Sequence, residues 1–231
     1  MGSLNGVARA GTGSLPVKVI GVALTLGLAV MLTQLRPAEL APNAGLVVQL
    51  LIGEAGWWIL GSAVLAWVIR SEGEHVSSIG LKPVSGRAIA WGIGGFFGLF
   101  ALFVLAQTLI AAVGVKAAAA AMSFADVPAW LIVLMAVRAG VVEEILFRGY
   151  AITRLESLTG RTWLAALVSL LVFVALHAGS WSASHLLFVS LAGGALTGLY
   201  LWHRNLTANI IAHTTFDIAG LLLAKYAATA A

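Results

Sequence analysis

Long apolar stretches are the feature that most constrains how this chain can fold. Several of them approach or exceed the roughly 20 residues that a helix needs to cross a ~30 Å hydrocarbon core. With 61% hydrophobic and only 10% charged residues, the chain is far from the balance of a soluble domain. Strand alternation is absent, so the spanning elements are expected to be helices. The stretches are Val19–Leu35, Leu46–Ile69, Ala88–Val113, a fourth beginning at Ala129, Trp163–His177, Leu186–Trp202 and Leu206–Ala224.

The sequence therefore predicts an all-α, polytopic bundle of about seven transmembrane helices, with residues 1–231 forming a single membrane domain. The polar stretch Arg70–Arg87 is expected to be a cytoplasmic loop. Ala112–Val127 is interpreted as a surface helix or an external loop. The spacings Gly94–Gly98 and Gly194–Gly198 are of the kind that lets helix backbones approach closely.

Basic residues indicate the orientation. With seven spans and a cytoplasmic amino terminus, nine of them lie inside and three outside, a positive-inside bias. The inner ones are Arg9, Lys18, Arg70, Lys82, Arg87, Arg148, Arg154, Arg161 and Arg204; the outer ones are Arg36, Lys116 and Lys225. Arg138 is not counted because it lies within the fourth apolar stretch. The net charge of +4 is scattered and not clustered, so no nucleic-acid partner is predicted.

The first apolar segment has two interpretations. Arg9 and Lys18 precede a short apolar run, as in a signal peptide. No small-residue cleavage site follows closely, so we favour a retained membrane anchor. A composition rich in Ala, Gly and Leu indicates a bacterium, and thus the inner membrane, as the setting.

Ionisable residues within the apolar stretches are costly in a bilayer, and three of these stretches carry them. The fourth holds Glu143, Glu144 and Arg148, the fifth ends at His177, and the seventh holds His213 and Asp217. Positions four apart share a helix face, so Glu144 can pair with Arg148, and Asp217 can orient His213. Adjacent positions point in different directions, so Glu143 is expected to stay unpaired and to face elsewhere. One carboxylate and two imidazoles from separate helices are a set that can activate water for peptide-bond hydrolysis.

The depth of these residues in the membrane predicts a long fourth helix. If that helix ended near Arg148, Glu143 would lie close to the inner face, whereas His177 lies about 14 residues, or ~21 Å, beyond Trp163. We therefore expect the helix to continue to about Ser157. This extension moves Glu143 toward the middle of the membrane and buries Arg148 against Glu144.

The three blocks together resemble the CPBP family of CAAX-processing and bacteriocin-processing enzymes, also called the Abi family. Its pattern is EExxxR, then FxxxH, then HxxxN or HxxxD, and residues 129–224 contain these motifs in that order. The resemblance implies an intramembrane endopeptidase in which Glu143 and His177 activate water while His213 and Asp217 form the oxyanion site. It also implies a peptide or membrane-protein substrate. Where better-studied eukaryotic members carry Asn, this chain has Asp217; we expect its carboxylate to orient His213.

Several other chemistries are excluded or remain as alternatives. The chain has no cysteine, and no HExxH, Gly-x-Ser-Gly or Gly-x-Gly-Asp string occurs. A divalent metal such as zinc, held by His177, His213 and Glu143, is a variant of the same enzyme. A proton-coupled transporter and a non-catalytic peptide-binding or immunity protein are alternatives from other classes. Glu54, which has no partner evident in the sequence, is not assigned a catalytic role.

Overall fold

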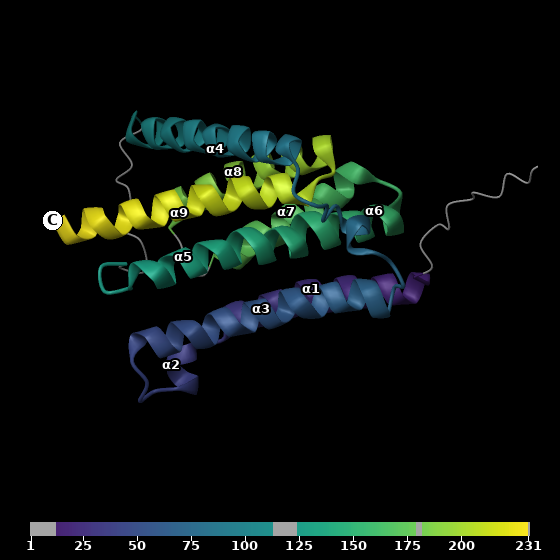
Figure 1. The fold of residues 1–231 in the computed structure, drawn as a ribbon, viewed down its shortest axis with the longest axis horizontal. Coiled ribbons are helices and arrows are strands. Elements are labelled where there is room, and N and C mark those ends of the chain that lie inside the picture. Colours follow the sequence, from purple (N-terminus) through teal and green to yellow (C-terminus); the bar gives the residue numbers. More distant parts are fainter. Residues whose placement is uncertain (1–12, 113–123, 179–181, 231) are drawn as a thin grey trace, which may run out of the picture.

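The computed structural model describes residues 13–112, 124–178 and 182–230, and every regular element within them is helical. Figure 1 shows α1 and α3 along one side of the bundle and α4 along the other, with α5, α6 and α9 between them. The elements are α1 (Leu15–Gln34), α2 (Pro37–Leu40), α3 (Leu46–Arg70), η1 (Val76–Ile79), α4 (Gly86–Ala112), α5 (Ala129–Arg138), η2 (Ala139–Ala151), α6 (Ile152–Thr159), α7 (Thr162–His177), α8 (Ala183–His203) and α9 (Leu206–Ala230).

The helices fit the predicted membrane bundle. Within the described residues, five are long and apolar enough to cross a membrane: Leu15–Gln34, Leu46–Arg70, Gly86–Ala112, Ser184–His203 and Leu206–Ala227. At 16 residues, α7 is shorter than a typical span. The count of seven spans stays a prediction. Lys116 and the alanines at 117–121 belong to the segment expected to be external, and they lie outside the described residues.

The distribution of side chains is that of a protein in lipid. Large apolar residues such as Ile59, Phe97 and Leu223 are more than 60% exposed on the outside of the bundle. Charged side chains such as Glu144 and Arg148 are buried inside it. In water this arrangement would leave an extensive apolar surface uncovered, whereas in a bilayer the exposed side chains meet acyl chains. The helical membrane bundle is confirmed.

The fourth predicted helix is the element on which the site depends. It runs without a break from Ala129 to Thr159, which confirms the long helix expected from the depth of Glu143. The sequence pattern did not indicate that its middle, Ala139–Ala151, is π-helical. Such segments are rare and often occur at functional sites. Outside donors stabilise this segment: the Ser169 hydroxyl donates to the Phe147 carbonyl at 2.8 Å and the Thr153 hydroxyl to the Gly149 carbonyl at 2.6 Å.

One end of the bundle collects the ends of α3, α6 and α8 and the starts of α1, α4, α7 and α9 (Figure 1). The loop predicted at Arg70–Arg87 lies here and is ordered around η1. The backbone N–H of Leu206 donates to the Gly80 carbonyl at 2.8 Å, which fixes the loop to the turn between α8 and α9. At the same end, hydrogen bonds from the Arg204 guanidinium lower the pKa of the Glu156 carboxyl, so this pair stays charged at neutral pH.

The glycine spacings singled out in the sequence do not make the close contacts expected of them. A Cβ atom at Gly94, Gly98, Gly194 or Gly198 would meet nothing within 4 Å, so the expectation was wrong. The close approaches occur at neighbouring glycines. A Cβ at Gly95 would lie 2.8 Å from Ala212 on α9, and one at Gly193 would lie 2.9 Å from Leu170 on α7. Spacing alone could not show which face of α4 or α8 turns inward.

Candidate active site

Glu144 is the centre of a fully buried network. Its Oε1 accepts a hydrogen bond from Arg148 Nη1 at 2.9 Å, which is the pair expected from positions four apart. On the opposite side, Oε1 lies 2.9 Å from His213 Nδ1, and Oε2 accepts from the Asn209 amide at 3.1 Å. Because a carboxylate oxygen can only accept, the His213 nitrogen must donate. Glu144 thus joins η2 to α9, whereas the sequence had indicated only its role with Arg148.

Asp217 lies beside the other nitrogen of the same imidazole. Its Oδ2 is 3.4 Å from His213 Nε2, as the spacing of four residues on α9 predicts. Both ring nitrogens of His213 therefore face a carboxylate, Glu144 on one side and Asp217 on the other. Only an imidazolium, with an N–H at each nitrogen, can donate to both. We call Glu144, Arg148, Asn209, His213 and Asp217 the interior cluster.

Glu143 does turn away from Glu144, but the expectation that it is unpaired was wrong. Its Oε1 accepts a hydrogen bond from Arg138 Nη1 at 2.9 Å. The π-helical segment explains this pair. Hydrogen bonds of a π-helix join residues five apart, so positions 138 and 143 become neighbours, whereas side chains in an α-helix meet at three and four.

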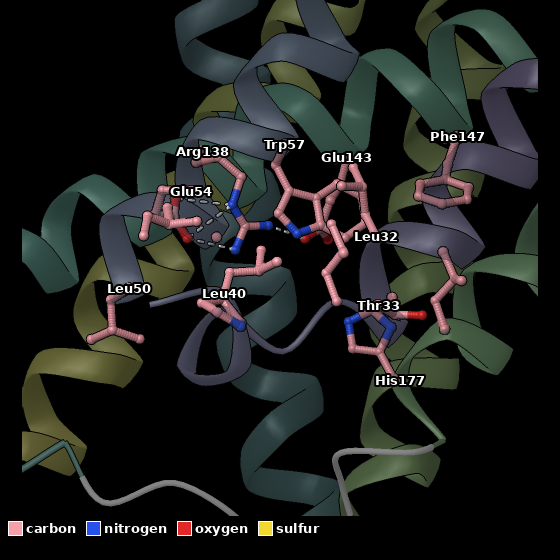
Figure 2. A pocket seen from close by; sticks show the side chains of 16 residues that line it. Leu32, Thr33, Leu40, Leu50, Glu54, Trp57, Arg138, Glu143, Phe147 and His177 are labelled. Carbon is pink, nitrogen blue, oxygen red and sulfur yellow. Dashed lines mark hydrogen bonds and ion pairs between the residues drawn. The ribbon is translucent and has the colours of Figure 1, made fainter. Parts of the chain in front are cut away.

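Arg138 is held from a third helix as well. Its Nε and Nη2 donate to the Glu54 carboxylate of α3 at 3.1–3.3 Å. The guanidinium also lies 5.5 Å from the centre of the Trp57 ring. Glu54 therefore has a partner, and Arg138 joins it to Glu143. We call Glu54, Arg138 and Glu143 the carboxylate–guanidinium triad (Figure 2).

Glu143 and His177 line the same pocket, a cavity of about 330 Å³ (Figure 2). Its walls come from the end of α1, α2, the first half of α3, the triad and the end of α7. His177 Nδ1 lies 2.8 Å from the Phe173 carbonyl, to which it must donate. This bond fixes the tautomer of a neutral imidazole and leaves Nε2 as an acceptor. The Glu143 side chain is 13% exposed, so it faces the pocket and not lipid.

The interior cluster lies next to this pocket but does not line it. The charge of Arg138 interacts with the Asp217 carboxylate of α9, which links the two groups. His185, at the start of α8, interacts electrostatically with both His177 and Asp217. The helices η2 and α9 approach each other closely between these two groups. A Cβ at Gly140 would lie only 2.7 Å from the backbone nitrogen of Thr214.

The residues present do not fit the predicted metal site. Within the part of the chain that the structure describes, no three His, Asp or Glu side chains gather so that they could hold a metal ion. His213 also turns both nitrogens toward carboxylates, so neither lone pair is directed at a common point with Glu143 and His177. Zinc dependence is a question for a chelation experiment, and no chemical step below depends on a metal.

Sequence reasoning missed the pairing of Arg138 with Glu54, and it missed Asn209 and His185 as neighbours of the site. A signal existed for the first two. Each is a lone charge inside an apolar stretch, the two have opposite signs, and an unpaired charge in a membrane is costly. Asn209 lies four residues before His213 and so shares its face of α9. For His185, no pattern in the sequence indicates the approach to His177 and Asp217.

Comparison with known proteins gives one match. Residues 125–219 match the model of a family described as Type II CAAX prenyl endopeptidase Rce1-like. The match includes all three motifs and every member of the interior cluster, and it confirms the resemblance to the CPBP family. That family implies CAAX endopeptidase activity. Neither a curated protein nor a solved structure matches the chain.

Proposed function

Because residues 125–219 carry the pattern of the CAAX prenyl endopeptidase family, we propose that this chain is a glutamate-type intramembrane endopeptidase in which Glu143 and His177 activate water. The observation that carries this proposal is that both side chains line one pocket inside the bundle. A pocket of about 330 Å³ has room for a water molecule and a short extended peptide segment.

Glu143 is the proposed general base. Arg138 occupies Oε1, and we find no hydrogen-bond partner for Oε2 among the described residues. The free oxygen accepts a proton from water as the water oxygen bonds to the scissile carbonyl carbon. The resulting tetrahedral intermediate collapses when the carbon–nitrogen bond breaks, and the proton passes from Glu143 to the leaving nitrogen. The carboxylate is thereby restored.

His177 is proposed to position the same water molecule. Its Nδ1 donates to the Phe173 carbonyl, so Nε2 is the nitrogen with a free lone pair. A water molecule that donates one hydrogen to Nε2 and the other to Glu143 turns its oxygen lone pair toward the substrate. Two acceptors from different helices define the position of the nucleophile better than one.

His213 is proposed to stabilise the oxyanion. Flanked by Glu144 and Asp217, its imidazolium places a fixed positive charge beside the pocket, and that charge favours the negative oxygen of the intermediate. Asp217 then serves to orient and hold the charged ring. Substitution Asp217→Asn removes this carboxylate but keeps the shape, so we expect most activity to be lost; retained activity would instead indicate a neutral hydrogen-bond donor.

The substrate is proposed to be a peptide or a membrane protein that reaches the pocket within the bilayer. In the orientation favoured by the positive-inside bias, the pocket lies toward the external half of the membrane, because its wall includes Leu35 and Pro37 beside external Arg36. The amino terminus is then cytoplasmic and the membrane is a bacterial inner membrane. Cysteine labelling of engineered Thr33→Cys and Ser85→Cys variants from outside intact cells tests this: only the former should react.

A comparison of peptides in membranes tests the proposed activity even though the substrate is unidentified. Membranes from cells that produce the wild-type chain or Glu143→Gln, at equal protein levels, are compared by mass spectrometry for newly formed peptide ends. We expect fragments that depend on Glu143. Glu39→Gln changes an exposed side chain that does not line the pocket, so it is the matched control and should give the wild-type fragments. Identical fragments from all three would contradict proteolysis and favour a transporter or a peptide-binding protein.

A further inference from the structure

A second cavity lies at the end of the bundle where the start of α4 meets the turn between α8 and α9. It measures about 220 Å³ and is separate from the pocket of Glu143. The residues that line it are Lys82, Arg87, Trp91, Trp202, His203, Asn205 and Ala208. Two cations, an amide and two indoles thus surround one cavity that contains no acidic side chain.

The cations of this cavity differ from three others at the same end, which are paired with carboxylates. Arg154 binds Glu72 and Arg204 binds Glu156, each at 2.6 Å, and Lys18 lies 3.9 Å from Glu74. The side chains of Lys82 and Arg87, by contrast, make no ion pair and no hydrogen bond with any described residue, and no carboxylate lines their cavity. Their positive charge is therefore available to a ligand.

The polar lining is fixed in place. The Lys82 carbonyl accepts a hydrogen bond from the Thr207 hydroxyl at 2.5 Å, which holds the loop against α9. Asn205 Oδ1 accepts from the backbone N–H of Thr207 at 3.1 Å, so its amide NH₂ group is left to donate. The Lys82 ammonium, the Arg87 guanidinium and the Asn205 amide are all donors, a set that suits the oxygens of a phosphate.

The aromatic lining places the cavity at the level of lipid headgroups. The His203 ring lies 4.0 Å from the Trp91 ring and stacks on Trp202, and its Nε2 is buried with no hydrogen-bond partner among the described residues. The Trp202 side chain is 75% exposed. Ile89 and Ile93, which lie two residues before and after Trp91 on α4, are exposed as well. Indole rings concentrate at the membrane–water interface, where one edge is apolar and the other wet.

We infer that this cavity binds the phosphate group of an anionic lipid headgroup, with acyl chains along the apolar surface of α4. Basic pockets between transmembrane helices on the cytoplasmic side recognise such headgroups. A lipid is favoured over a soluble phosphate because the exposed Trp202 continues the cavity toward the lipid-facing surface. This site is independent of the proposed peptidase chemistry, since no residue lines both cavities.

Native mass spectrometry of the purified chain tests the site directly. The protein is taken from nanodiscs that contain phosphatidylcholine with phosphatidylglycerol, and the retained lipid is measured. We expect retained phosphatidylglycerol in the wild type and a loss on the order of tenfold in the double variant Lys82→Gln/Arg87→Gln, because each removed charge weakens the attraction. Arg70→Gln/Arg161→Gln removes the same charge at the same end, outside the cavity, and should retain the lipid.

A second measurement distinguishes the source of the phosphate. Thermal unfolding is followed with and without inorganic phosphate in a neutral detergent. Stabilisation of the wild type but not of the double variant, without preference for phosphatidylglycerol, would support the phosphate site with a soluble ligand. Equal lipid retention by both double variants, or an equal loss in both, together with no effect of phosphate, would overturn the proposal.

Discussion

Arg138 and Glu143 are five residues apart on one helix and are joined by an ion pair of 2.9 Å. An α-helix would turn these side chains in different directions, whereas the π-helical turn that begins at Ala139 brings them together. Arg138 also forms an ion pair with Glu54 on α3. The guanidinium thus connects Glu143, the proposed base, to a second helix. The π-helical backbone of η2 therefore places the proposed base beside Arg138.

Removal of Arg138 should reduce activity because Glu143 would lose the bond that fixes its orientation. We expect Arg138→Gln to lower kcat/KM by about ten- to a hundredfold, the range for loss of a positioning contact. Arg138→Lys should recover little, since one ammonium cannot reach both carboxylates as a guanidinium does. The exposed Arg36, paired with Glu39, supplies the control Arg36→Gln. Wild-type kinetics in Arg138→Gln would contradict a positioning role.

Loss of the Glu144 charge should destabilise the whole bundle. Glu144→Gln keeps the size of the side chain but leaves Arg148 buried without a carboxylate, a change that costs about 3 kcal/mol or more. Thermal unfolding in detergent should show a markedly lower Tm. Glu39→Gln breaks an ion pair whose side chains are more than 70% exposed, and its Tm should hardly change. Equal Tm values for the two variants would show that the interior cluster does not hold the helices together.

Gly140 should tolerate no side chain. A methyl group there would press on the backbone of Thr214 and push α9 away from η2, which costs about 1–3 kcal/mol and separates Glu144 from His213. We expect Gly140→Ala to lose both stability and activity. Gly94→Ala is the matched control, because a methyl group there meets open space. A folded and fully active Gly140→Ala protein would contradict the close approach of η2 and α9 at this position.

Chelation tests the zinc variant of the mechanism. Since His177, His213 and Glu143 do not converge and both His213 nitrogens face carboxylates, we expect activity to survive 1,10-phenanthroline and added zinc to have no stimulating effect. The inactive isomer 1,7-phenanthroline controls for non-specific effects. If the chelating isomer alone abolished activity and zinc restored it, His213 would have to release Glu144 in order to bind the metal. That result would contradict the water activation proposed above.

The sequence predicted the parts of this structure that follow from local rules. The helix positions follow from apolar length, and the contacts Glu144–Arg148 and His213–Asp217 follow from positions four apart on one face. The continuation of the fourth helix past Arg148 followed from the need to bring Glu143 and His177 to similar depths. These predictions need only regular helical geometry and the cost of charge in lipid.

Other features depend on geometry that a single sequence does not contain. Nothing in residues 139–151 indicates a π-helix, so the Arg138–Glu143 pair appeared only in the structure. The bond between Glu144 and His213 requires the packing of η2 on α9, which depends on the close approach at Gly140. Spacing of small residues predicted the wrong glycines for close contact, because spacing does not show which face of a helix is turned inward.

The most direct test of the central claim is cleavage by the purified protein. Wild type, Glu143→Gln and the control Glu39→Gln are reconstituted in liposomes with fluorogenic substrates, including a prenylated CAAX peptide and transmembrane peptides, and the Tm of each protein is measured in parallel. We predict that wild type and Glu39→Gln cleave the same bond, while Glu143→Gln keeps its fold and loses cleavage by at least two orders of magnitude. Cleavage by a folded Glu143→Gln protein at the wild-type rate would contradict the account.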